Sequence, residues 1–197
     1  MAQPLTDEER VLLETPDEEI HEKYKPLSFD TKRFKERITI GEPWQQLIQT
    51  HLYLDHTISL MIADALYKPS AINTGRMGFV QKLQLVEGMG LLRDDVISAI
   101  RVVNGLRNSI AHDLNFEISE TDVRNVVNAI PKFLREIMKA EKGRPKGPLS
   151  FVEALTVLTL HSEVERTRHI IVRVLNKKGE LRLRDVLNKT PVPRKSP

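Results

Sequence analysis

The spacing of apolar residues in the middle of the chain most constrains its fold. Between residues 42 and 67 apolar side chains recur three, four or seven positions apart, at Leu47, Leu54, Ile58 and Met61. This period places them on one face of an α-helix, whereas a half-buried strand would alternate apolar and polar residues. Similar spacing returns in later stretches, and only a short LRLRDV segment alternates. We therefore predict an all-α protein, an up-and-down helical bundle.

We expect about five helices in this bundle. They cover residues 42–67, 79–90, 93–113, 119–142 and 149–178. Segments rich in Gly and Pro, 68–78 and 143–148, separate them as loops. Pro131 lies inside the fourth helix and is expected to kink it, because proline has no N–H to donate.

Charge divides the chain of 197 residues into three parts. Residues 1–41 hold seven basic and ten acidic residues and are predicted to form a charged N-terminal arm with short helices at TDEERVLLE and PDEEIHEKYK. Residues 42–178 form the helical domain, and residues 179–197 form a basic, mobile tail. Residues 143–197 hold twelve basic and five acidic residues, which favours binding of a polyanion such as nucleic acid. A solvated tail that only aids solubility explains the same charges.

Several classes of protein are excluded by what the sequence lacks. It has no cysteine, so neither a disulfide framework nor a thiolate metal site can form. No apolar run reaches the roughly 20 residues of a membrane span, and the acidic N-terminus is unlike a secretory signal. His51 and His56 lack the spacing of a helical metal site. We expect a cytoplasmic protein with no metal, no cofactor and no membrane contact.

The end of the third predicted helix carries the best candidates for chemistry. Asn104, Asn108 and His112 follow one another at intervals of four residues and form a polar stripe beside the apolar one. Arg107 lies about 140° around the helix from His112, so the two share a cleft only if the arginine reaches across or a second subunit contributes.

Such residues suit cleavage of RNA without a metal. Histidine exchanges protons near neutral pH and can serve the 2′-hydroxyl or the leaving oxygen. The guanidinium of Arg107 fits a phosphate and stabilises the charge that develops on it, and the amide of Asn108 can hold a phosphate oxygen or orient the histidine. The alternative is structural: Arg107 pairs with an acid, and His112 caps its own helix. Lys82 is expected to be a solvated helix residue, with a phosphate contact as the second interpretation.

The stretch MGFVQKLQLVEGMGLLRDDVISAIRVVNGLRNSIAHD resembles the HEPN superfamily (higher eukaryotes and prokaryotes nucleotide-binding domains). The resemblance rests on an Arg followed by four residues and a His, here Arg107 and His112, with Asn108 after the arginine. It covers about residues 42–140 and is closest to the branch that includes the mannitol operon repressor. It implies a helical bundle that dimerises so that two motifs line one cleft, and an acidic residue on the first bundle helix, for which Asp55 is the match.

The sequence therefore favours a HEPN-like, metal-independent endoribonuclease with Arg107, His112, Asn108 and Asp55 as candidate catalytic residues. RNA is the expected substrate, a homodimer the expected assembly, and a toxin–antitoxin or phage-defence system the expected setting, with an antitoxin or regulatory protein as partner. One alternative is a non-catalytic HEPN-like binding or regulatory protein of the transcriptional regulator type. Another is a structural bundle in which RNSIAH only closes a helix.

Overall fold

A computed structural model describes residues 4–113, 115–140 and 147–189, and these residues form helices, turns and loops without a strand. The all-α class is thus confirmed. The chain divides into two compact units. One spans Leu27–Arg166, and the other combines the segment up to Pro26 with the chain from Thr167 onward. Within the described ranges, every helix is too short or too polar to span a lipid bilayer.

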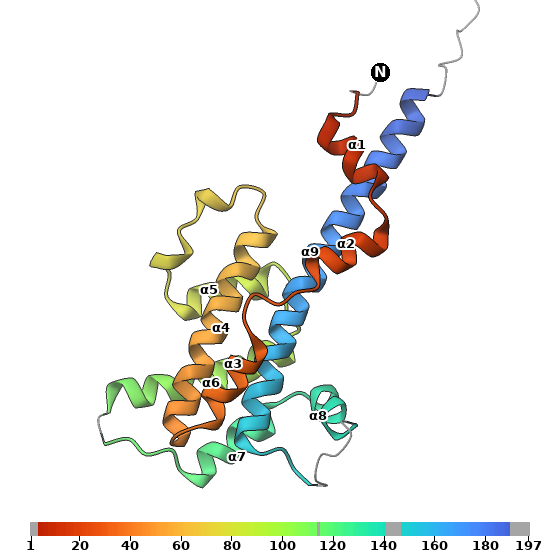
Figure 1. The fold of residues 1–197 in the computed structure, drawn as a ribbon. Coiled ribbons are helices and arrows are strands. Elements are labelled where there is room, and N and C mark those ends of the chain that lie inside the picture. The colour runs from red at the N-terminus through yellow and green to blue at the C-terminus, as the bar shows by residue number, and fades with distance from the viewer. Residues whose placement is uncertain (1–3, 114, 141–146, 190–197) are drawn as a thin grey trace, which may run out of the picture. The chain divides into compact units, whose positions relative to one another are not determined.

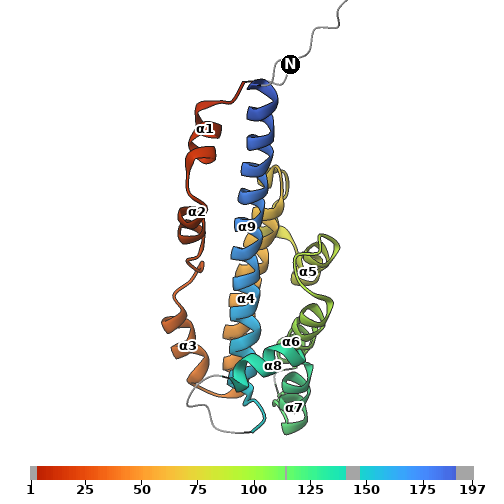
Figure 2. The same cartoon turned by 90° about the vertical axis from the view of Figure 1, so that its right-hand side faces the viewer.

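The unit Leu27–Arg166 contains most of the helices (Figure 1, Figure 2). They are α3 (Thr31–Thr39), α4 (Pro43–Ala65), α5 (Phe79–Gly88), α6 (Asp94–His112), α7 (Glu120–Ala129), α8 (Lys132–Lys139) and the first part of α9 (Phe151–Lys189). Two short 3-10 helices, η1 (Pro69–Ala71) and η2 (Thr74–Arg76), lie between α4 and α5. Both views place α4 alongside the first part of α9, up to residue 166, and α3 alongside α4.

The predicted core stripes are buried in this unit. Leu47, Leu54 and Ile58 of α4 are fully shielded from solvent, as is Val103 of α6. They join one cluster with residues of α5, α7, α8 and α9. Burial of a large aliphatic side chain contributes about 1.5–3 kcal/mol, so this cluster is the main source of stability.

Helix ends follow local signals, and one of them differs from expectation. Ser119 and Asp122 form a capping box at the start of α7. Pro131 does not kink a single helix: α7 ends at Ala129 and α8 begins at Lys132. The ring of a proline disfavours the helical conformation in the residue before it, and Ile130 has a ψ of 125°. The predicted helix 119–142 is therefore two helices, and the count of about five is not confirmed.

The N-terminal segment is less peripheral than predicted. Residues 31–39 form α3, and its side chains Phe34 and Ile38 are completely buried. The ring centroids of Phe34 and Tyr53 on α4 lie 4.7 Å apart, and those of Phe29 and Tyr53 lie 4.9 Å apart. Residues 27–41 thus belong to the bundle unit rather than to a charged arm, because these aromatic rings pack against α4.

The second unit contains α1 (Asp7–Glu14), α2 (Asp17–Tyr24) and the part of α9 after Arg166. The two short helices expected in residues 1–41 are present. Lys178 Nζ lies 2.5 Å from Asp17 Oδ1, and Arg184 pairs with Glu9. The predicted tail begins inside α9, which continues to Lys189 with Leu181 buried. Residues 190–197 of that predicted tail lie outside the described residues.

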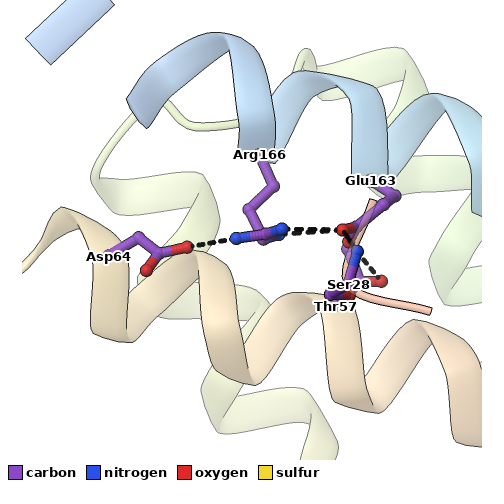
Figure 3. A network of polar contacts seen from close by, with 5 residues as sticks. All are labelled: Ser28, Thr57, Asp64, Glu163 and Arg166. Carbon is purple, nitrogen blue, oxygen red and sulfur yellow. Dashed lines mark hydrogen bonds and ion pairs between the residues drawn. The ribbon is translucent and has the colours of Figure 1, made fainter. Parts of the chain in front are cut away.

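A buried polar network joins α4, α9 and the segment before α3 (Figure 3). Glu163 is fully buried and accepts hydrogen bonds from the Ser28 N–H at 2.6 Å, from the Thr57 hydroxyl at 3.0 Å and from Arg166 at 2.8 Å. Arg166 also donates to Asp64 at 2.6 Å. Every charge in this interior network therefore has a partner, which is the condition for burying charges at tolerable cost.

Burial alone would raise the pKa of Glu163, but the hydrogen bonds from Arg166 and Ser28 and the charge of Arg166 outweigh it and lower that pKa below 4.5. A carboxyl with a lowered folded pKa stabilises the fold above its unfolded pKa, and this contribution is lost as pH falls through the folded pKa. The network therefore stabilises the protein near neutral pH and weakens in acid.

We expect Glu163→Gln to lower the free energy of unfolding by about 3 kcal/mol, because it leaves Arg166 short of a buried partner. Thr57→Val removes one hydrogen bond and should cost about 1 kcal/mol. Urea unfolding at pH 7 measures both. The gap between wild type and Glu163→Gln should also shrink as the pH is lowered below 4.5, and a gap that stays constant in acid would contradict this account.

Candidate functional site

Helix α6 positions three of the predicted residues on one wall of a cavity. The helix buries Val103 and Leu106 in the core, and this orientation turns Asn104, Arg107 and Asn108 toward α4 and α5. The cavity has a volume of about 440 Å³. Its other walls come from α4, α5 and the segment before α5. The lining residues are His51, Leu52, Asp55, Gly75, Met77, Gly78, Phe79, Val80, Gln81, Lys82, Asn104, Arg107 and Asn108.

The structure thus brings Asp55, Asn104, Arg107 and Asn108 together, but it does not bring His112 to them. His112 is the last residue of α6, is exposed and does not line the cavity. Within one chain, Arg107 and His112 therefore do not meet at one cavity, as the helical period predicted.

Arg107 is half-buried and has no carboxylate partner among the residues that the structure describes. Its Nη1 donates a hydrogen bond of 3.3 Å to Asn108 Oδ1. A guanidinium has five N–H donors, so most of its donors remain free to bind an anion in the cavity. The described residues therefore do not form the structural alternative, in which Arg107 pairs with an acid of this chain.

His51 is a cavity residue that sequence reasoning assigned no role. Its Nε2 lies 3.0 Å from Asn104 Oδ1, and its ring centroid lies 4.3 Å from that of Phe79. Burial lowers the pKa of His51 below 6.5, the bond to Asn104 opposes this shift, and the charge of Arg107 adds to it. His51 is therefore neutral at pH 7 and donates to the amide oxygen. The signal for this role that was available in the sequence is the position of His51 four residues before Asp55.

Lys82 is not the solvated residue that was expected. Its side chain is 6% exposed, and Nζ lies 2.7 and 2.9 Å from the two carboxylate oxygens of Asp55. The reason is that α5 packs against α4, so a lysine on that face must reach an acid or remain an unpaired buried charge. This pair fixes the orientation of Asp55 at the cavity wall.

A metal centre has no support in the described residues, which contain no group of three His, Asp or Glu side chains able to hold an ion. His51 and His56 face different hollows, since only His51 lines the α4–α6 cavity. The polar groups of this cavity include the amides of Asn104 and Asn108, the Arg107 guanidinium, the His51 imidazole and the Lys82–Asp55 pair.

No protein-family model, curated protein or solved structure matches the chain. The site is therefore interpreted from its own residues and their geometry.

The lowered pKa of His51 makes stability depend on pH in a defined direction. A histidine that stays neutral in the fold binds fewer protons than in the unfolded chain, so acidification below 6.5 favours unfolding until the folded pKa is reached. We expect His51→Gln to be less sensitive than wild type to acidification through this window. Urea unfolding between pH 7.5 and about 5 measures the difference, with His56→Gln, an exposed neighbour, as control. Parallel pH curves for wild type and His51→Gln would refute the shift.

Removal of one partner of the Lys82–Asp55 pair should be worse than removal of both. Asp55→Ala leaves a buried ammonium without a partner and should cost about 2–3 kcal/mol of unfolding free energy, after allowance for the partial exposure of Asp55. Lys82→Met keeps the volume of the buried stem and should cost less. The double variant should be more stable than Asp55→Ala alone, as chemical denaturation can measure. Additive losses would mean that the two charges are not coupled.

Proposed function

We propose that this chain is a HEPN-like, metal-independent endoribonuclease whose substrate strand enters the α4–α6 cavity. The observation that supports the proposal best is a half-buried arginine without a carboxylate partner among the described residues, placed beside two asparagines and a held carboxylate. Arg107 binds the scissile phosphate and stabilises its developing charge, and Asn108 fixes the guanidinium through Oδ1.

The reaction needs no reagent beyond the substrate and two proton transfers. The 2′-hydroxyl loses its proton and forms a bond to phosphorus, the bond from phosphorus to O5′ breaks, and O5′ gains a proton. The products are a 2′,3′-cyclic phosphate and a 5′-hydroxyl. His112 is the proposed proton carrier, because histidine exchanges protons near neutral pH.

The position of His112 outside the cavity makes a second copy of the chain part of the proposal. A two-fold interface presents the same patch twice and would bring the His112 of one subunit to the Arg107 of the other. Such a homodimer would act on cytoplasmic RNA, in a toxin–antitoxin or phage-defence setting with a protein antitoxin or regulator as partner.

A non-catalytic regulator is the second candidate, and the exposure of His112 is the observation that favours it. In that case Arg107 and its neighbours bind RNA or a regulatory partner, and no bond is broken.

We expect the pure protein to cleave mixed RNA in EDTA and to leave 2′,3′-cyclic phosphate ends. Arg107→Ala and His112→Ala should each lower the rate at least about 100-fold, the usual contribution of such groups. Gel assays with end-group analysis measure both. Arg101→Ala on the same helix is the matched control for arginine, because Arg101 pairs with Glu87 and does not line the cavity. His21→Ala, on α2, is the corresponding control for the loss of a histidine.

Mixing the two inactive variants tests the shared site. A heterodimer of Arg107→Ala and His112→Ala subunits keeps one complete pair and should regain part of the activity. Loss of cleavage in EDTA with recovery on adding a divalent ion would rule out the mechanism. RNA that is bound but never cut by the wild type would support the regulator instead.

A further inference from the structure

A second hollow lies between α4 and α3, on the face of α4 next to the α4–α6 cavity. It has a volume of about 340 Å³. It is lined by Ser28, Phe29, Arg37, Gln49, Leu52, Tyr53 and His56. We call it the α3–α4 groove. All of its walls belong to the unit Leu27–Arg166, and α3 lies outside the region that carries the family resemblance.

The groove is suited to an anion. Arg37 is exposed on α3 and makes no ion pair with any described residue. None of the described residues that line the groove carries a negative charge. An arginine in a groove without acids retains its full attraction for a phosphate, because no carboxylate of the protein competes for its donors.

The groove also offers aromatic surface next to this charge. Phe29 and Tyr53 are half-buried and line it, and their rings pack edge to face at 4.9 Å, which holds both side chains in place. Proteins that bind single-stranded nucleic acid combine a cationic groove with aromatic side chains on which bases stack. The pairing of Arg37 with Tyr53 and Phe29 has this composition.

The groove and the α4–α6 cavity meet at one residue. Leu52 lines both, and its side chain is 58% exposed on the ridge of α4 between them. A strand that leaves the cavity over this ridge would pass directly into the groove. The two hollows lie on adjoining faces of one helix and together present Arg107 and Arg37, neither of which has a carboxylate partner among the described residues.

We propose that the α3–α4 groove is a second contact surface for the RNA strand, in which Arg37 binds a phosphate outside the cleavage cavity and Phe29 and Tyr53 receive an unpaired base. This inference rests on the proposed function, because it places the same strand in the α4–α6 cavity. It assigns to α3 the role of lengthening the substrate contact, so that strands long enough to cross Leu52 bind more tightly than short ones.

The test compares Arg37→Ala with Arg33→Ala, both in the His112→Ala background so that the RNA stays intact. Arg33 is exposed on the same helix and does not line the groove, so it controls for the loss of one charge from α3. Fluorescence anisotropy in EDTA measures the affinity for a labelled single-stranded RNA of about 12 nucleotides and for a dinucleotide. Arg37→Ala should weaken binding of the long RNA about tenfold and reduce the salt dependence of its affinity, while dinucleotide binding stays unchanged.

Several outcomes would overturn the inference. These are equal effects of Arg37→Ala and Arg33→Ala on the long RNA, an equal loss for the dinucleotide, and displacement of the RNA by an oligoglutamate peptide at lower concentration than by unlabelled RNA. The last would assign the groove to an acidic protein partner. Cleavage by the wild type with no selective effect of Arg37→Ala refutes only the groove. A selective effect without cleavage keeps the groove and refutes the ribonuclease.

Discussion

The unit Leu27–Arg166 depends on helix α4, because residues on several sides of this helix contact different neighbouring helices. Leu54 lies in the apolar core, and Tyr53 packs against the aromatic rings next to α3. Asp55 holds Lys82 of α5, His51 holds Asn104 of α6, and Thr57 donates to α9. Consecutive helical residues point about 100° apart, so a short stretch of one helix can serve all these partners. Both hollows exist because α4 keeps α3, α5 and α6 at fixed positions around it.

Buried charges set the register of these contacts. The Lys82–Asp55 pair fixes α5 against α4, and the Glu163–Arg166 pair with Asp64 fixes α9 against α4. Apolar packing tolerates small slides between helices, whereas a buried ion pair loses much of its energy when its partners separate. The main effect of these pairs is therefore to fix the relative positions of the helices, and their contribution to total stability is secondary. A cavity wall that must present a carboxylate at a defined place benefits from such an arrangement.

The sequence predicted the all-α class and the stretches that form α4 to α8 and α9 as far as residue 178, because long apolar periods depend on local spacing. It did not predict the continuation of α9 to Lys189. It did not predict α3, whose only fully buried side chains, Phe34 and Ile38, lie four residues apart among charges. Burial of Lys82 was missed because it requires Asp55, 27 positions earlier in the chain, which no local pattern indicates. The grouping of Asp55 with Asn108 and Arg107 came from a resemblance, and the structure places all three at one cavity.

The polar stripe of α6 relates the cavity to His112. Asn104 is buried, Asn108 is half-buried and His112 is exposed, so the stripe leads from the interior of the cavity to the surface at the helix end. Asn108 and His112 are about one turn apart, or roughly 6 Å along the axis. A phosphate bound by Arg107, as proposed, would lie near the start of this path, and His112 lies near its exit. For His112 to serve that phosphate, either the strand must follow the stripe outward or a second subunit must cover the cavity with its own α6. Both arrangements require contact along α6 beyond Asn108, and this requirement separates a nuclease from a protein that only binds at Arg107.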